Sequence, residues 1–341
     1  MISLVVSPSF SGYRLDNFIK EQNIEELYSR TLIDKLIVNQ KVSLNSKIIT
    51  KKSFLVKEND LIIIQIDQEE QSIDYKLNKE DIPLNILFED EFLAIINKPA
   101  GIVVHPGAGN KSGTLVNGLI NHFGDNLSNL DDTNEHPSHD LRPGIVHRLD
   151  KETSGLIIIT KDNKTHYEMS KLFMNREIEK SYLCICLGVP SVLSGTIDKP
   201  IGRHKTDRKK MTVLDEGKNA ITHYQTLIDF EYFALLKLIL ETGRTHQIRV
   251  HMESIHHPII GDTVYNSLKR ILGSCPSNKQ TAIKLFLNKN INRQILHANT
   301  VKFIHPRTNQ EIYIEAEPPD DMLSFITFLK NKFTFYEIGI S

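Results

Sequence analysis

Residues 143–155 read Pro143-Gly144-Ile145-Val146-His147-Arg148-Leu149-Asp150-Lys151-Glu152-Thr153-Ser154-Gly155, and the rest of the chain is organised around them. The apolar run at 156–159 follows directly and predicts a buried strand. Two glycines bracket the segment and permit tight backbone geometry. A carboxylate on a loop that feeds a core strand is held rigidly and can still face a cleft, as a catalytic acid or nucleophile requires. An isolated loop aspartate more often only caps a turn. Asp150 is nevertheless a catalytic candidate because of the pattern of residues around it.

This pattern resembles the signature of the RluA/RluD-type pseudouridine synthases, which isomerise uridine to pseudouridine in RNA. The signature is His-Arg-Leu-Asp, two variable residues, and then Thr-Ser-Gly or Thr-Thr-Gly. Every fixed position is present from His147 to Gly155. So long a pattern is far more specific than a short glycine motif, and the remaining chain is therefore compared with the same family.

The composition sets limits on the class of protein. The 341 residues are enough for two domains, and the formal net charge of −1 means that RNA binding has to depend on local basic patches. No apolar stretch reaches transmembrane length, and the first residues lack the pattern of a secretory signal. The cysteines fit neither a zinc knuckle nor a disulfide framework, which predicts a protein of the reducing cytoplasm. They are Cys184, Cys186 and Cys275.

We expect three parts along the chain. Residues 1–70 predict two helices and a small sheet, including a strand at 54–56, and resemble an S4 RNA-binding domain. Its basic side chains suit RNA phosphates, with Arg14, Arg30 and Lys35 as the candidate contacts. A surface-charged module with no ligand is the alternative. Residues 71–81 are expected to be a linker, and residues 82–335 a catalytic domain.

Apolar periodicity outlines the elements of the catalytic domain. Strands are expected at 93–96, 102–104 and 179–188, with a hairpin formed by 220–230 and 233–240. Helices are expected at 114–123, 163–173 and 322–330. Residues 267–292 predict an insertion with one short helix, and residues 126–142 a polar surface insertion. The latter contains His136 and His139, but a flexible histidine pair makes a poor zinc site, so no metal is expected.

The second family signature is Gly243-Arg244-Thr245-His246-Gln247-Ile248-Arg249, and Tyr182 occupies the Lys-x-Tyr position of the family. The resemblance implies an α+β pseudouridine synthase fold: a large, mixed, mostly antiparallel sheet with a central cleft. It also implies that Asp150 is the catalytic carboxylate and that Arg244 is its ion-pair partner. Tyr182 is expected to lie against the uracil and to assist removal of the C5 proton. Arg148 would fill the gap left by the flipped-out base. The isomerisation requires no cofactor.

The most basic stretch of the chain spans residues 199–210 and is either a solvated loop or an arm that contacts RNA phosphates. Beside a centre that modifies RNA we favour the arm. Its candidate contacts are Arg203, Lys205, Arg208, Lys209 and Lys210.

Other functions stay open at this point. A retaining glycosidase also uses a nucleophilic aspartate but needs a second carboxyl about 5 Å away, and Glu152 is the nearest in sequence. A non-catalytic RNA-binding or ribosome-assembly protein is the other class. If the chain is a pseudouridine synthase, its expected substrate is large-subunit ribosomal RNA, as in the RluD branch. Transfer RNA is the alternative substrate. The protein is expected to be monomeric.

Overall fold

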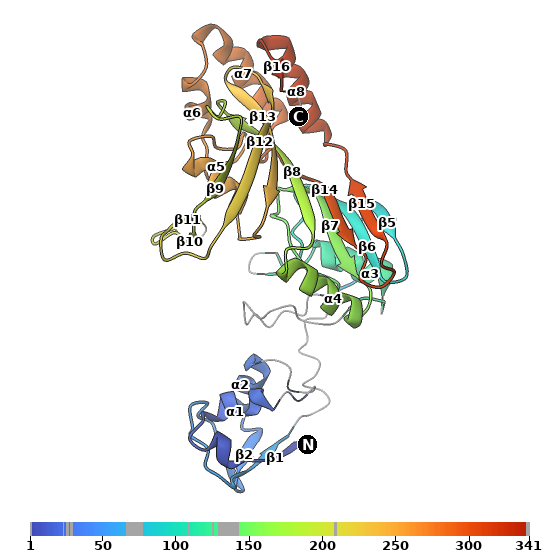
Figure 1. Ribbon diagram of the computed structural model, residues 1–341, viewed down its shortest axis with the longest axis vertical. Helices are drawn as coiled ribbons and strands as arrows, with labels where there is room; N and C mark the ends of the chain where they lie inside the picture. The colour runs from blue at the N-terminus through green and yellow to red at the C-terminus, as the bar shows by residue number, and fades with distance from the viewer. Residues whose placement is uncertain are drawn as a thin grey trace. The chain divides into compact units, whose positions relative to one another are not determined.

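The computed structural model describes residues 2–22, 24, 27, 30–65, 78–107, 110–124, 126–128, 143–207 and 210–338 (Figure 1). Contacts between residues divide the chain into two compact units, whose described parts are residues 2–65 and 78–338. Each unit has hydrophobic clusters of its own, as an independently folding domain requires.

The first unit packs two helices on a four-stranded antiparallel sheet with strand order β1-β4-β2-β3. Leu15, Phe18 and Ile37 are fully buried between the layers. Asn45 and Ser46, both with positive φ, form the tight turn of the β2–β3 hairpin. The expected strand at 54–56 is wrong, because Leu55 makes only an isolated bridge to Arg14. The elements are β1 (Ile2–Val5), η1 (Pro8–Phe10), α1 (Leu15–Glu21), α2 (Arg30–Val38), β2 (Val42–Leu44), β3 (Lys47–Ile48) and β4 (Leu61–Ile64).

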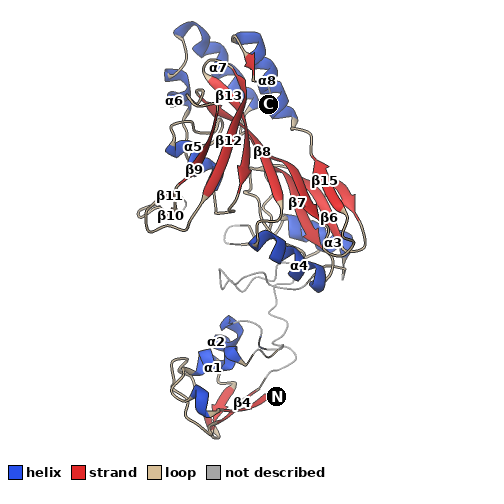
Figure 2. Ribbon diagram, viewed as in Figure 1, coloured by secondary structure: helices blue, strands red, loops and turns tan. Residues whose placement is uncertain are grey.

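The second unit is built on a ten-stranded sheet whose main path runs β16-β12-β13-β8-β14-β7-β6-β5, with β15 paired to β14 and β9 to β12. One pairing, β14 with β7, is parallel and the others are antiparallel, which confirms the expected mixed sheet. Figure 2 shows the strands crossing the unit, with helices at both ends.

Its strands are β5 (Ile86–Glu89), β6 (Leu93–Lys98), β7 (Ser154–Thr160), β8 (Glu179–Leu187), β9 (Ser194–Asp198), β10 (Ile201–Arg203), β11 (Met211–Val213), β12 (Ile221–Asp229), β13 (Phe233–Leu240), β14 (Leu296–Ile304), β15 (Glu311–Glu315) and β16 (Tyr336–Glu337). Strands β10 and β11 form a separate two-stranded arm. The helices are α3 (Leu115–Phe123), α4 (Asn163–Met174), α5 (Gln247–Ser254), α6 (Leu268–Gly273), α7 (Ser277–Asn290) and α8 (Asp320–Lys332).

Strand β7 is covered on both faces, which explains its continuous apolar run. Along β7, Ile157 and Ile159 pack into the cluster that includes α3 and α5, whereas Leu156 and Ile158 pack into a cluster on the other face. Side chains alternate between faces along a strand, so a strand buried on both faces is apolar throughout. The strand predicted at 156–159 is therefore confirmed within β7, whose residues are all buried.

Three other expectations need correction. Residues 102–104 are not a strand, because the carbonyls of Val103 and Val104 accept hydrogen bonds from the first backbone N–H groups of α3. The 267–292 insertion contains two helices, α6 and α7. Residues 78–81 belong to the second unit and not to a linker, because the Glu80 carboxylate accepts from Gly113 N.

Candidate active site

A pocket on the α5 side of the sheet gathers side chains from segments far apart in sequence. Its walls come from the loop before β7, from β8, from residues 243–249 and from Leu296 of β14. Four residues singled out in the sequence line it together: Arg148, Asp150, Tyr182 and Arg244. The fold thus brings the two signature motifs to one place.

Asp150 lies on a loop whose backbone is fixed at several points. Thr153 N donates to Asp150 O at 3.1 Å, which closes a turn. The ammonium of Lys98 donates to Lys151 O at 3.2 Å and to two carbonyls of the 99–102 turn. Burial lowers the pKa of Lys98 to about 8. A buried cation that contacts the residue after Asp150 ties the loop to the end of β6.

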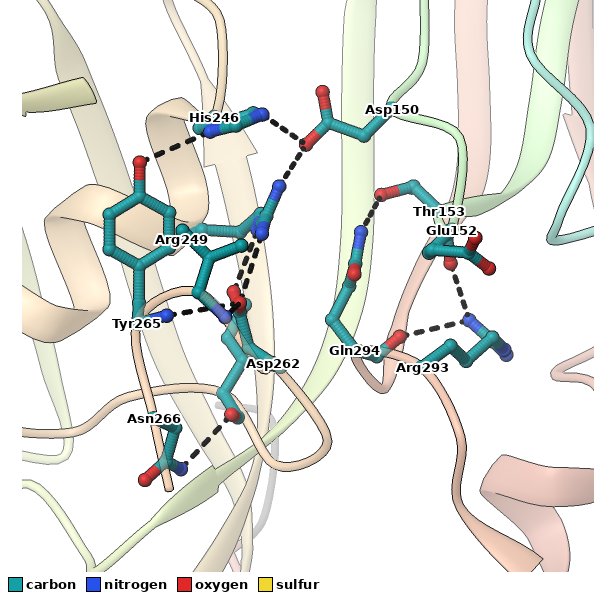
Figure 3. Close-up of polar contacts among 12 residues, drawn as sticks. Asp150, Glu152, Thr153, His246, Arg249, Asp262, Tyr265, Asn266, Arg293 and Gln294 are labelled. Carbon is teal, nitrogen blue, oxygen red and sulfur yellow. Dashed lines mark hydrogen bonds and ion pairs between the residues drawn. The ribbon is translucent and has the colours of Figure 1, made fainter. Parts of the chain in front are cut away.

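Asp150 pairs with Arg249 and not, as expected, with Arg244 (Figure 3). Arg249 Nη1 donates to Asp150 Oδ2 at 3.0 Å. Its Nε and Nη2 donate to the two oxygens of Asp262 at 2.7 and 2.9 Å, a bidentate contact that fixes the guanidinium plane. Burial by itself opposes the charge of Arg249, but the hydrogen bonds and charges of Asp262 and then Asp150 raise its pKa. The guanidinium therefore stays charged and aims the Asp150 carboxylate.

The position at which α5 begins explains why Arg249 and not Arg244 reaches Asp150. The helix begins at Gln247, so Arg244 lies in the preceding turn, and Arg249 lies inside the helix next to Asp262. Arg244 is half-buried at the pocket, where its Nε donates to Asn219 O at 3.2 Å. The buried Gln247 side chain accepts from Arg244 N at 3.0 Å and so fixes this turn.

His246 is a further residue of the site. Its Nε2 lies 4.0 Å from Asp150 Oδ2, and its Nδ1 lies 3.1 Å from the hydroxyl of Tyr265 (Figure 3). Burial lowers the pKa of His246, although the charge of Asp150 acts in the opposite direction. Its backbone has a φ of 56°, a left-handed conformation that residues other than glycine rarely adopt. His246 is thus a mostly neutral imidazole beside the carboxylate.

Tyr182 projects from β8 into the same pocket and is 8% exposed. Burial, and then the negative charge of Asp150, raise the pKa of its hydroxyl. The phenol is therefore protonated at neutral pH, and its ring forms an apolar wall. Arg148, in contrast, is exposed at the edge of the pocket.

The basic arm is joined to this site. The Tyr265 hydroxyl accepts from Met211 N at 2.8 Å and donates to Met211 O at 3.1 Å, which attaches β11 to the residue that contacts His246. Arg203 and Lys205 are exposed on the arm, and Lys210 is half-buried. Arg208 and Lys209 lie outside the described residues.

The candidate RNA contacts of the first unit are only partly described. Arg14 is bound bidentately to Asp16 at 3.0 and 2.8 Å, and about half of its side chain is exposed. Arg30 and Lys35 fall within α2, but their side chains are outside the described part of the chain.

The described residues contain no cluster of three or more His, Cys, Asp or Glu side chains that could hold a metal ion. His136 and His139 lie outside that part of the chain. No helix within the described ranges has the length and hydrophobicity needed to span a bilayer.

Sequence reasoning missed Arg249, His246, Asp262 and Tyr265. His246 and Arg249 belong to the second signature, which could have marked them as candidates. The motif does not reveal which of its two arginines, Arg244 or Arg249, reaches Asp150. Asp262 and Tyr265 stand in no recognised pattern. Their role follows only from the turn that brings them under α5.

Two family models match the chain. Residues 93–254 match the RNA pseudouridylate synthase family, and residues 14–62 match the S4 domain. Ribosomal large subunit pseudouridine synthase D of Vibrio cholerae is 37% identical over 330 residues, which cover 96% of this chain and 95% of that protein. The protein of the same name from Escherichia coli (strain K12) is 37% identical over 335 residues, or 97% and 95% of the two chains.

A solved structure, Human RNA Pseudouridylate Synthase Domain Containing 1, has the same fold, with a TM-score of 0.54 at 20% identity over 77% of this chain and 92% of that chain. The chain therefore belongs to the RNA pseudouridine synthase family and is an enzyme of that class.

Proposed function

We propose that this enzyme isomerises uridines of large-subunit ribosomal RNA, with Asp150 as the catalytic carboxylate. Two relatives that align with nearly the whole chain are named ribosomal large subunit pseudouridine synthases, which supports the choice of substrate. The S4 match over residues 14–62 supports RNA as the binding partner.

The reaction breaks the bond between uracil N1 and ribose C1′, turns the base, and joins C5 to C1′. The proton on C5 is lost and N1 gains one, so substrate and product have the same composition and no cofactor is consumed. The target base has to leave the helical stack before C1′ and C5 can be reached, which costs a few kcal/mol.

The observation that carries the proposal is the environment of Asp150. It is the one carboxylate among the described residues that line the pocket, and Arg249 holds it from 3.0 Å away. Such a fixed carboxylate can either attack C1′ or remove a ribose proton. A retaining glycosidase would need a second carboxyl close by, and the described lining offers none.

The other pocket residues suit the remaining steps. The Tyr182 ring gives the flipped uracil an apolar surface, and the protonated hydroxyl serves as a hydrogen-bond donor rather than a base. Arg148, exposed at the edge of the pocket, can occupy the gap in the RNA stack. Arg244 and the basic arm can contact phosphates beside the target nucleotide.

Replacing Asp150 by Asn tests the catalytic role. The amide keeps the shape but loses charge and nucleophilicity, so pseudouridine formation should disappear while RNA binding and melting temperature stay near those of the wild type. Asp229→Asn, at the distant β12–β13 turn, is the matched control and should keep full activity. Substantial product from purified Asp150→Asn would overturn the assignment. Activity in the presence of a chelator should be unchanged.

Pseudouridine mapping of total RNA from cells with and without the protein tests the substrate. Sites that vanish from large-subunit ribosomal RNA are expected, whereas losses confined to transfer RNA would reject the ribosomal proposal.

We also propose that the enzyme acts in the cytoplasm, since Cys184, Cys186 and Cys275 are free and buried, which fits a reducing compartment. Its monomeric state stays a prediction.

A further inference from the structure

A buried arginine outside both signature motifs contacts the loop that carries Asp150. Arg293 has a side chain only 4% exposed, and its Nη1 donates to Glu152 O at 3.1 Å (Figure 3). The same nitrogen donates to Gln294 O at 3.0 Å and to Leu296 O at 3.3 Å. Leu296 itself lines the active pocket. One guanidinium thus joins the catalytic loop to the first residue of β14.

The opposite edge of this guanidinium is held by the C-terminal helix. Its Nε and Nη2 donate to the two oxygens of Asp321 at 2.6 and 2.8 Å, in the first turn of α8. Met322, Phe325 and Leu329 anchor that helix in a hydrophobic cluster. A buried cation requires full pairing, and the carboxylate together with three carbonyls supplies it.

The two residues after Arg293 make further contacts, one to the loop that bears Asp150 and one to the chain before Asp262. Gln294 Nε2 donates to Thr153 Oγ1 at 3.2 Å, and Ile295 N donates to Ile260 O at 2.9 Å. Ile260 is two residues before Asp262, the carboxylate that fixes Arg249. The 293–295 segment therefore touches the loop that bears Asp150 and the chain that supports its partner.

We propose that Arg293, held by Asp321, is a positioning residue that sets the distance between Asp150 and Arg249 for the reaction. The guanidinium is required because its five N–H groups form a planar fork, whereas a lysine ammonium is a point charge that cannot bind a carboxylate bidentately and reach the loop carbonyls. The inference rests on the proposed role of Asp150.

The test uses Arg293→Lys and Asp321→Asn in the full chain, with an unmodified transcript of large-subunit ribosomal RNA. Single-turnover rates at saturating enzyme separate the chemical step from binding. Arg293→Lys should lower this rate roughly 10- to 100-fold, the size of effect that a small misplacement of reacting groups produces, while KM changes less than about twofold. Asp321→Asn should lower it in the same direction but less, since Asp321 is 22% exposed.

Arg307 and Asp162 provide the matched control, because they also form an arginine–carboxylate pair at the start of a helix, away from the pocket. Arg307→Lys and Asp162→Asn should leave the single-turnover rate unchanged, and they should cost less thermal stability because this pair is more exposed. If Asp321 acts through Arg293, the double variant should react no more slowly than Arg293→Lys alone.

Equal rate losses in both pairs, or a loss that only follows the unfolded fraction, would reduce Arg293 to a structural residue and overturn the inference. An unimpaired Arg293→Lys would overturn it as well. If Arg293→Lys fails to fold, the single-turnover rate of Asp321→Asn decides, provided that this variant has the melting temperature of the wild type. A lowered rate would support the inference, and an unchanged rate would overturn it. An inactive wild type, or an active Asp150→Asn, would instead refute the proposed function.

Discussion

At the scale of single residues, the site depends on which arginine reaches the carboxylate. Arg244 and Arg249 stand five positions apart in one motif, yet only Arg249 is buried between two aspartates, Asp150 and Asp262. Asp262 is completely buried, so its charge is balanced by Arg249. The same arginine therefore stabilises the fold and orients the Asp150 carboxylate.

Substitution of the two arginines by lysine should separate their roles. Arg249→Lys loses the fork that binds Asp262 and aims Asp150, so kcat should fall by about 10²-fold or more. Arg244→Lys keeps a positive charge at the pocket edge and should mainly raise KM. Steady-state kinetics of both variants on the same transcript provides the comparison. The reverse assignment, with kcat lost in Arg244→Lys and kept in Arg249→Lys, would restore the expectation from the sequence.

At the scale of elements, β7 follows the loop that bears Asp150 and is fixed at two points. His147 Nε2 accepts from Ile158 N at 2.8 Å and the ring lies 4.7 Å from that of Phe173. At its start, on the edge opposite β6, β7 meets β14 in the parallel pairing, where Gly155 lies opposite Ala298. The first histidine of the signature and its last glycine thus serve the strand rather than the chemistry.

His147 predicts a specific pH dependence of stability. Burial, with Lys180 as a smaller cause, lowers the pKa of His147 to about 3. Between pH 6.5 and 3, His147 is therefore protonated in the unfolded chain but neutral in the native state. Its contribution to the free energy of unfolding is complete above pH 6.5 and is lost as the pH falls. In urea titrations from pH 7.5 to 4.5, the stability advantage of wild type over His147→Asn should shrink by up to about 1.4 kcal/mol per pH unit. A difference independent of pH would contradict this account.

Gly155 predicts a packing defect. Its φ is +111°, and an added Cβ would lie 2.2 Å from Ala298 O. Gly155→Ala should therefore separate β7 from β14 and cost more than about 3 kcal/mol. Gly273→Ala is the control, since nothing lies within 4 Å of its added Cβ, and should change stability by less than about 1 kcal/mol. Thermal unfolding of the two variants measures both effects, and comparable melting temperatures would refute the close approach.

At the scale of the whole molecule, the two units have separate hydrophobic cores. The pocket residues all belong to the second unit, and the S4 match falls within the first. We propose that the first unit contributes affinity and site choice but no chemistry. Contacts to phosphates release counterions, so each one lost makes the salt dependence of binding shallower.

A truncation tests this division, and it should start at Leu77 because residues 78–80 contact α3 and the turn before it. The shortened enzyme should fold, bind ribosomal RNA more weakly, and lose about 0.7 to 0.9 log units of salt slope per missing phosphate contact. It should still convert uridine at high enzyme concentration. Salt-titrated binding and site mapping of both proteins give the answer. Identical slopes and site patterns would show that the first unit reads no RNA.

The sequence by itself determined the family, the α+β class, the main strands and helices, and the pocket residues Arg148, Asp150, Tyr182 and Arg244. These follow from local patterns: short apolar runs predict strands, and a motif can be recognised without knowledge of its neighbours in space. The correct arginine partner of Asp150, by contrast, depended on where α5 begins, which a single motif does not reveal.

Only the tertiary structure decided the contacts between distant segments. Asp262 meets Arg249 because a turn passes beneath α5, and Arg293 meets Glu152 because β14 runs parallel to β7. Neither pair shows a periodic or local signal, since side chains 13 and 141 positions apart become neighbours only when the chain folds back on itself. The sequence therefore determined which groups are the candidates for the chemistry, whereas the packing of the sheet decided which groups hold them in place.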